Sequence, residues 1–139
     1  MSDKDFVNKY LEDFSKLVKP NAEVVEKIIQ VKNILMETKK NKGKVMIFGN
    51  GGSAAIASHV SVDLTKCANI RSVNFNEADL ITCLSNDYGY EKWVAKAIDF
   101  YSDKEDVLIL ISSSGKSLNM INACEAARRK KVSKIITFT

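Results

Sequence analysis

The sequence predicts an α/β protein in which two N-terminal helices precede a three-layer, doubly wound parallel sheet. The first observation is a set of short, continuous apolar runs, typical of strands covered on both faces. These runs are residues 45–48, 107–111 and 134–138. The second observation is helical periodicity between the runs, since strands that alternate with helices form βαβ units. We expect a single domain over residues 1–139, with helices in 1–42 and the sheet in 43–139.

Two amphipathic helices are predicted before the sheet. In the first, apolar residues recur at steps of three and four from Phe6 to Val18, and Pro20 ends the helix. Asn21 is a candidate N-cap for the second helix, which ends in a lysine cluster followed by Gly43. Their apolar stripes could pack against another subunit or against the chain's own domain, and we expect oligomer contacts here.

The other elements follow in order along the chain. We expect helices at about 53–68, 90–101 and 117–130, and a weaker strand at 70–75. Only Thr139 follows the last strand. Because a doubly wound sheet normally covers such a strand with a later helix, we expect a sheet that is cut short at the C-terminus or completed by something else.

Composition restricts the function classes. The net charge is only +4, and the 45% hydrophobic and 27% charged content is typical of a soluble globular protein. No apolar run approaches the roughly 20 residues of a membrane span, and no apolar segment follows the N-terminus as in a secretory signal. The basic clusters lie at predicted helix ends, where the helix dipole favours cations, so we prefer that explanation to nucleic-acid binding. We expect a cytoplasmic protein that binds neither membrane nor nucleic acid.

The three cysteines are Cys67, Cys83 and Cys124. They are far apart and lie among apolar residues, so we expect buried, reduced thiols. Their spacing offers neither a disulfide framework nor a zinc site.

Two unusual loops follow two of the predicted strands. The glycine loop, Gly49 to Ser53, and the serine loop, Ser112 to Ser117, each come after a strand and open a helix. Ligands of open α/β sheets bind beyond the carboxyl ends of strands, and helix N-termini favour phosphate. Each loop alone could be a tight turn or a helix cap, but two in equivalent places favour a phosphate site. Neither matches the Walker A or the Gly-x-Gly-x-x-Gly pattern.

Two further positions carry ionisable groups of interest. His59 and Asp63 are four residues apart in the helix after the glycine loop, so they share one face of a nearly apolar helix. They could be a hydrogen-bonded pair, Asp63 could turn to solvent, or both could have a catalytic function. Asp87, between Asn86 and Tyr88, is consistent with an ordinary turn or with sugar binding.

These motifs together resemble the phosphoheptose isomerases, which are sugar isomerase (SIS) domain proteins. The resemblance rests on the glycine loop with His59, on residues 85–89 and on residues 111–117, and it spans the chain. It implies a SIS-type, flavodoxin-like sheet. It also implies the isomerisation of sedoheptulose 7-phosphate to D-glycero-D-manno-heptose 7-phosphate through an enediol, a step of bacterial lipopolysaccharide biosynthesis. Family members look like cytoplasmic homotetramers, with the N-terminal helices at the centre and active sites between subunits.

The resemblance also assigns roles to residues. The serine loop would hold the phosphate of the substrate, through Ser112, Ser113, Ser114 and Ser117. The sugar or its phosphate would be contacted by Asn50, Gly51 and Ser53. Asp87 would contact sugar hydroxyls. His59 and Asp63 would be catalytic and would also ligate zinc, which several members bind.

Departures from the family pattern open an alternative. The family has glutamate at the position of Asp63, and a misplacement of about 1 Å can reduce a rate about 10²-fold. His59 is the only histidine, whereas the family has a glutamine and a second histidine on a later helix. Two ligands do not complete a zinc site, so activity of the 139 residues alone is in question. The alternative is a non-catalytic SIS-domain module that binds a sugar phosphate or a protein, such as one that associates with a replication initiator.

Overall fold

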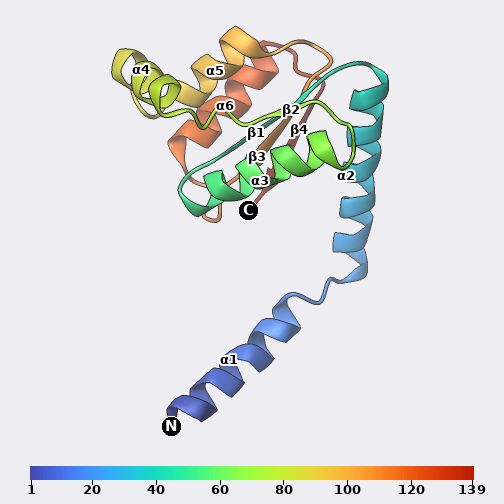
Figure 1. The fold of residues 1–139 in the computed structure, drawn as a ribbon, viewed down its shortest axis with the longest axis vertical. Coiled ribbons are helices and arrows are strands. Elements are labelled where there is room, and N and C mark those ends of the chain that lie inside the picture. Colours follow the sequence, from blue (N-terminus) through green and yellow to red (C-terminus); the bar gives the residue numbers. More distant parts are fainter. The chain divides into compact units, whose positions relative to one another are not determined.

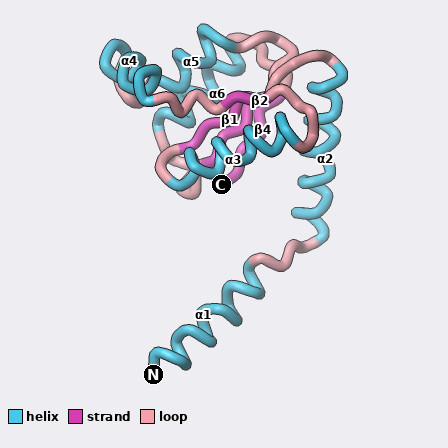
Figure 2. The backbone as a smooth tube through the Cα atoms, in the orientation of Figure 1, coloured by secondary structure: helices cyan, strands magenta, loops and turns pink.

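A computed structural model describes all residues from Met1 to Thr139 in two compact units, Met1–Asn33 and Ile34–Thr139. The boundary between the units lies within helix α2. The first unit holds α1 (Asp3–Leu17) and most of α2 (Ala22–Lys40). The second holds the end of α2 and the sheet with its helices (Figures 1 and 2). Its elements are β1 (Val45–Gly49), α3 (Gly52–Lys66), β2 (Ser72–Val73), α4 (Ala78–Tyr88), α5 (Trp93–Tyr101), β3 (Val107–Ile111), α6 (Leu118–Arg129) and β4 (Lys134–Phe138).

The N-terminal helices begin at the residues that their caps select. A capping box at Ser2 opens α1. Asn21 caps the start of α2, as predicted: its side-chain Oδ1 accepts from the Val24 N–H at 2.8 Å. No residue of α1 is buried, so its whole apolar stripe faces outward.

The sheet is fully parallel, with strand order β2-β1-β3-β4. From β1 the chain moves to one side for β2 and then to the other side for β3 and β4, as in a flavodoxin-like sheet. Helix α3 covers one face, and α5 and α6 cover the other (Figure 1). The predicted three-layer doubly wound sheet is therefore confirmed.

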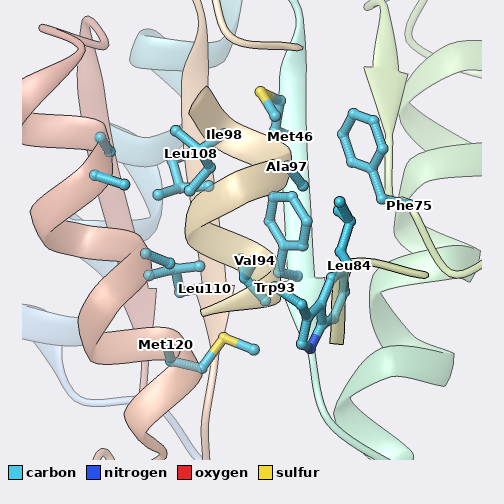
Figure 3. Close-up of a cluster of buried hydrophobic side chains, with 14 residues drawn as sticks. Met46, Phe75, Leu84, Trp93, Val94, Ala97, Ile98, Leu108, Leu110 and Met120 are labelled. Atoms are coloured by element: carbon cyan, nitrogen blue, oxygen red, sulfur yellow. The ribbon is translucent and has the colours of Figure 1, made fainter. Parts of the chain in front are cut away.

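The largest part of the core lies between the sheet and helices α5 and α6 (Figure 3). Alternate residues of β1 and β3 point into it. They are Met46, Phe48, Leu108 and Leu110. The Phe48 ring stacks on Phe75 at 5.5 Å between centroids and meets Trp93 edge-on at 5.9 Å. Burying each large apolar side chain contributes about 1.5–3 kcal/mol, so this layer fixes how the helices sit on the strands.

Helix α4 was not expected from the sequence. Asp79 and the polar run at residues 85–87 weaken its helix propensity, because short polar side chains compete for backbone hydrogen bonds. Packing overrides this preference, since Leu84 is buried in the core cluster. The interpretation of Asp87 as a turn residue is wrong, because Asp87 lies in the last turn of α4. The weak strand predicted at 70–75 is reduced to the two residues of β2.

The prediction of buried cysteines is wrong for two of the three. Cys67 and Cys83 are exposed, and only Cys124 is half-buried. Cys67 follows the end of α3, and Cys83 lies within α4, so neighbouring apolar residues in the sequence did not imply burial. Burial raises the pKa of the Cys124 thiol.

The last strand is only partly covered, as expected. Strand β4 is an edge of the sheet, and Thr137 and Phe138 are exposed while Ile136 is buried. Among the six helices, none has both the length and the apolar character needed to cross a membrane.

A buried carboxylate ties together the amino ends of the two central strands. Asp106 precedes β3 and is 1% exposed. Its carboxylate accepts from the backbone N–H of Lys44, which precedes β1, at 2.9 Å, and from the backbone N–H of Asp103 at 2.7 Å. The Lys44 ammonium completes the arrangement with an ion pair to Asp106 and another to Asp103. The lysine holds the pKa of the Asp103 carboxyl below its ordinary value, through a hydrogen bond and its charge.

We expect Asp106→Asn to lower the free energy of unfolding by about 3 kcal/mol, because it removes the buried carboxylate of the ion pair and leaves Lys44 with only the exposed carboxylate of Asp103. Urea denaturation followed by circular dichroism measures the change. Asp103→Asn is the matched control, since it removes a carboxylate from the same lysine at an exposed position and should have a much smaller effect. Equal losses for the two variants would contradict the role given to Asp106.

Candidate functional site

The glycine loop and the serine loop leave the sheet side by side. Strands β1 and β3 are neighbours, and their register pairs Gly49 with Ile111, the last residue of each strand. This is the topological switch point of the sheet, where the connections from the two strands turn to opposite sides and open α/β proteins bind ligands. The sequence placed both loops at carboxyl ends of strands, and the structure brings them to the same point of one edge.

The glycine loop requires glycine at two positions. Gly51 has a φ of 54°, which glycine adopts without strain. A Cβ on Gly49 would lie 2.5 Å from the backbone carbonyl carbon of Ser53, so only glycine lets α3 start so close to β1. No side chain caps the start of α3. The N–H groups of Ser53 and Ala54 donate to backbone carbonyls of the loop, so the N–H of Gly52 and the positive end of the helix dipole are what the start of α3 offers an anion.

The serine loop is held by backbone bonds and by its own hydroxyl groups. The Ser112 N–H donates to the carbonyl of Phe138 in β4 at 2.9 Å, and Gly115, with a φ of 62°, donates back to Ser112 at 3.0 Å. The Ser112 hydroxyl is buried and lies 3.3 Å from the Ser117 hydroxyl. Ser113 and Ser114 are exposed. Ser117 occupies the N-cap position of α6, but its side chain makes no cap bond, so the start of α6 is also open to a ligand.

A pair of amide side chains joins the glycine loop to the first turn of α6, which follows the serine loop. Asn50 Nδ2 donates to Asn119 Oδ1 at 3.0 Å, and Asn119 Nδ2 donates to Asn50 Oδ1 at 2.8 Å. Tyr90, which follows α4, donates its hydroxyl to the same Asn50 oxygen at 3.1 Å. Sequence reasoning predicted Asn50 as a site residue but missed Asn119 and Tyr90. A signal for Asn119 was present: it shares the apolar face of α6 with Ala123 and Ala126, and a buried amide there requires partners.

His59 and Asp63 share one face of α3, as predicted, and that face points to solvent. His59 Nε2 lies 3.6 Å from Asp63 Oδ2, and the two side chains are 81% and 56% exposed. The face of α3 that meets the sheet carries Ala57 and Ser61 instead. Of the alternatives that the sequence left open, the single chain shows the one in which Asp63 turns to solvent.

The residues present supply only part of a zinc site. His59 and Asp63 are two possible ligands, and no group of three or more His, Cys, Asp or Glu side chains gathers anywhere in the chain. Zinc requires four ligands, or three and water. These two side chains alone do not fit the ion.

Asp87 lies near the end of α4 with its carboxylate exposed. It accepts from the Asn86 side chain at 3.0 Å and from the Cys83 thiol at 3.9 Å. Three residues later, Tyr90 contacts Asn50 of the glycine loop, so the segment that carries Asp87 is anchored to the two-loop edge.

Comparisons with known proteins agree with this arrangement. The family profile described as SIS domain matches residues 9–139. The phosphoheptose isomerase of Buchnera aphidicola subsp. Schizaphis graminum is 36% identical over 99% of this chain and 71% of its own length. That of Helicobacter pylori strain P12 is 35% identical over 92% of this chain and 65% of its own length.

The chain belongs to the SIS-domain family and, within it, to the phosphoheptose isomerase family.

Solved structures give the same result. The phosphoheptose isomerase from Neisseria gonorrhoeae superposes with a TM-score of 0.85 at 28% identity, over 96% of this chain and 73% of the other. The phosphoheptose isomerase from Francisella tularensis gives 0.84 at 25% identity, over 99% of this chain and 76% of the other. The chain thus has this family's fold, and it spans about two thirds of the length of the curated relatives it matches.

We expect Gly49→Ala to destabilise the protein by about 1–3 kcal/mol, because the added methyl group collides with the backbone at the start of α3 and overpacks it. Gly52→Ala is the matched control, since a Cβ there meets nothing within 4 Å and alanine favours the helix. Thermal unfolding of both variants checks the prediction. A Gly49→Ala protein as stable as the control would show that this close approach is not needed.

Proposed function

We propose that the chain binds a sugar phosphate at the glycine and serine loops and serves as part of a phosphoheptose isomerase. The reaction is the conversion of sedoheptulose 7-phosphate to D-glycero-D-manno-heptose 7-phosphate. The observation that carries the proposal is the pairing of Gly49 with Ile111, which sets the two loops together at the switch point of a phosphoheptose isomerase fold.

The proposed phosphate site combines neutral donors rather than a dense positive charge. The exposed hydroxyls of Ser113 and Ser114, the Ser117 hydroxyl and the open start of α6 lie within one short loop. Hydroxyl and backbone N–H groups donate to phosphate oxygens, and the helix dipole adds a partial positive charge. Ser112 is buried, and its hydroxyl donates a hydrogen bond to the Ser117 hydroxyl. From the glycine loop, Asn50, Gly51 and Ser53 face the same ligand.

The proposed chemistry moves one proton between adjacent carbons. A base removes the proton from C1 of the ketose while the C2 carbonyl oxygen gains a proton, which gives an enediol. The C1 hydroxyl then loses its proton as the aldehyde forms, and C2 receives a proton, so the reaction is balanced without a redox partner. His59 or Asp63 is the proposed base, and Asp87 is proposed to hold sugar hydroxyls.

The exposure of His59 and Asp63 leads to a second part of the proposal. Proton abstraction beside a carbonyl benefits from a site that excludes water, whereas both side chains are open to solvent in one chain. We propose a homotetramer in the cytoplasm, whose contacts use the exposed stripe of α1 and bring further residues over α3. Those residues would also supply the additional ligands if zinc binds at His59 and Asp63. Placement in lipopolysaccharide biosynthesis follows from the proposed product.

The non-catalytic alternative is not favoured. The curated relatives that match nearly the whole chain are named as isomerases, and the two loops of the site are intact. The alternative remains an outcome of the turnover experiment below.

We expect the double variant Ser114→Ala and Ser117→Ala to bind sedoheptulose 7-phosphate about 100-fold more weakly. Each lost hydrogen bond to a charged group is worth about 1.5–3 kcal/mol, or roughly tenfold or more in affinity. Isothermal titration calorimetry measures the affinity. Ser133→Ala, on an exposed residue at the opposite edge of the sheet, is the matched control and should bind normally. Unchanged affinity in the double variant would refute the phosphate role of the serine loop.

The complete product of the gene that encodes this chain should interconvert the two heptose phosphates. We expect His59→Gln and Asp63→Asn each to reduce kcat by about 10²-fold or more, the usual contribution of a general acid or base, with little change in substrate affinity. Proton exchange at C1 in deuterated water, followed by NMR, measures the step directly. Normal binding without turnover in the wild-type protein would support the non-catalytic alternative instead.

A further inference from the structure

The amide pair between Asn50 and Asn119 joins the glycine loop of the proposed site to the first turn of α6, the helix that the serine loop opens. Asn119 lies in the first turn of α6 and is 3% exposed. Its amide makes two hydrogen bonds to the amide of Asn50, one in each direction, at 2.8 and 3.0 Å. A buried amide whose oxygen and nitrogen both bond to the same partner holds that partner in a defined orientation.

Counting donors and acceptors shows what Asn50 has left for a ligand. Its Oδ1 has two acceptor sites, and these take the Asn119 amide and the Tyr90 hydroxyl. Its Nδ2 has two N–H groups, one of which donates to Asn119. Asn50 therefore offers a ligand a single N–H donor and no free acceptor. Such a group suits an oxyanion or a carbonyl oxygen.

We propose that Asn119 and Tyr90 are positioning residues that fix Asn50 with one N–H directed to the ligand and set the spacing of the two loops. The inference rests on the proposed function, since the ligand in question is the sugar phosphate. Neither residue touches the ligand. They restrict the rotation of the Asn50 side chain before the ligand binds. Binding then loses little conformational entropy at Asn50, which makes the binding free energy more favourable.

An isosteric change tests the orientation directly. In Asn119→Asp, an ionised carboxylate keeps the acceptor for Asn50 Nδ2 but turns a second acceptor toward Asn50 Oδ1, so one hydrogen bond is replaced by repulsion. When the new carboxyl is protonated, its O–H donates to Asn50 Oδ1 and its carbonyl accepts from Asn50 Nδ2, which restores both bonds. Burial raises the pKa of such a carboxyl above its ordinary value of about 3.9, and the positive end of the α6 dipole acts in the opposite direction. The protonated, restored form increases as the pH falls toward 5.

The experiment measures the affinity for sedoheptulose 7-phosphate by calorimetry between pH 5 and 8, with the wild-type protein at each pH as reference. The wild-type reference cancels the titration of the phosphate itself. We expect Asn119→Asp to bind about tenfold more weakly than wild type at pH 8 and to approach wild type at pH 5. Asn119→Leu, which has a similar volume and no polar atoms, should bind weakly at every pH. A purely structural role would instead make both variants unstable without a pH-dependent recovery of binding.

Tyr90→Phe provides a second variant that leaves the fold intact, because this side chain is exposed. It removes only the hydroxyl that bonds to Asn50, and we expect a several-fold loss of affinity with an unchanged melting temperature. The inference is overturned if Asn119→Asp and Tyr90→Phe both match the wild type at pH 8, or if Asn119→Asp shows no recovery at pH 5. Failure of the wild-type protein to bind the sugar phosphate would overturn the proposed function and, with it, this inference.

Discussion

The parallel pairing of β1 with β3 is the constraint on which the rest of the structure depends. Five consecutive residue pairs, from Val45 with Val107 to Gly49 with Ile111, hold the strands in register. A shift of one residue would reverse which side chains face the core on that strand. It would also move one loop along the edge by about 3.3 Å, which is comparable to the length of a hydrogen bond. The core and the site are therefore specified by the same register.

Polar contacts close this pair of strands at both ends. At the amino end Lys44 and Asp106 meet, and at the carboxyl end Asn50 meets Asn119. The first contact is ionic and the second is neutral. Neutral amides suit the carboxyl end, because a fixed carboxylate there would repel a phosphate and a fixed cation would compete with the N–H groups of α3 and α6 for it. The neutral amide pair at the carboxyl end is thus compatible with the phosphate proposed to bind there.

The sequence predicted those elements whose residue types are compatible with few local structures, such as continuous apolar runs and glycine clusters. Apolar runs predicted β1, β3 and β4, and the glycine loop and serine loop were placed correctly at the ends of strands. Helix α4 was missed because its polar residues favour turns locally and only the packing of Leu84 decides otherwise. The exposure of His59 depends on how α3 lies on the sheet, which helical periodicity alone did not resolve, since Ile56 and Val62 on the same helix are also exposed. The link between Asn50 and Asn119 spans 69 positions, and no local pattern predicts a contact of that range.

The separation of the two polar contacts along the strands has a practical consequence. Lys44 and Asn50 are six residues apart along an extended strand of about 3.3 Å per residue, so the two contacts lie roughly 20 Å apart, beyond the distance at which mutational effects usually couple. Substitutions that stabilise the contact at Lys44 should therefore have effects on the free energy of unfolding that add to the effects of substitutions in the loops. Loop variants with altered ligand preference could be made in a protein that is first stabilised at Lys44. The added stability would allow destabilising loop substitutions without unfolding the protein. Strands β1 and β3 would then connect an amino end that is changed for stability to a carboxyl end that is changed for ligand recognition.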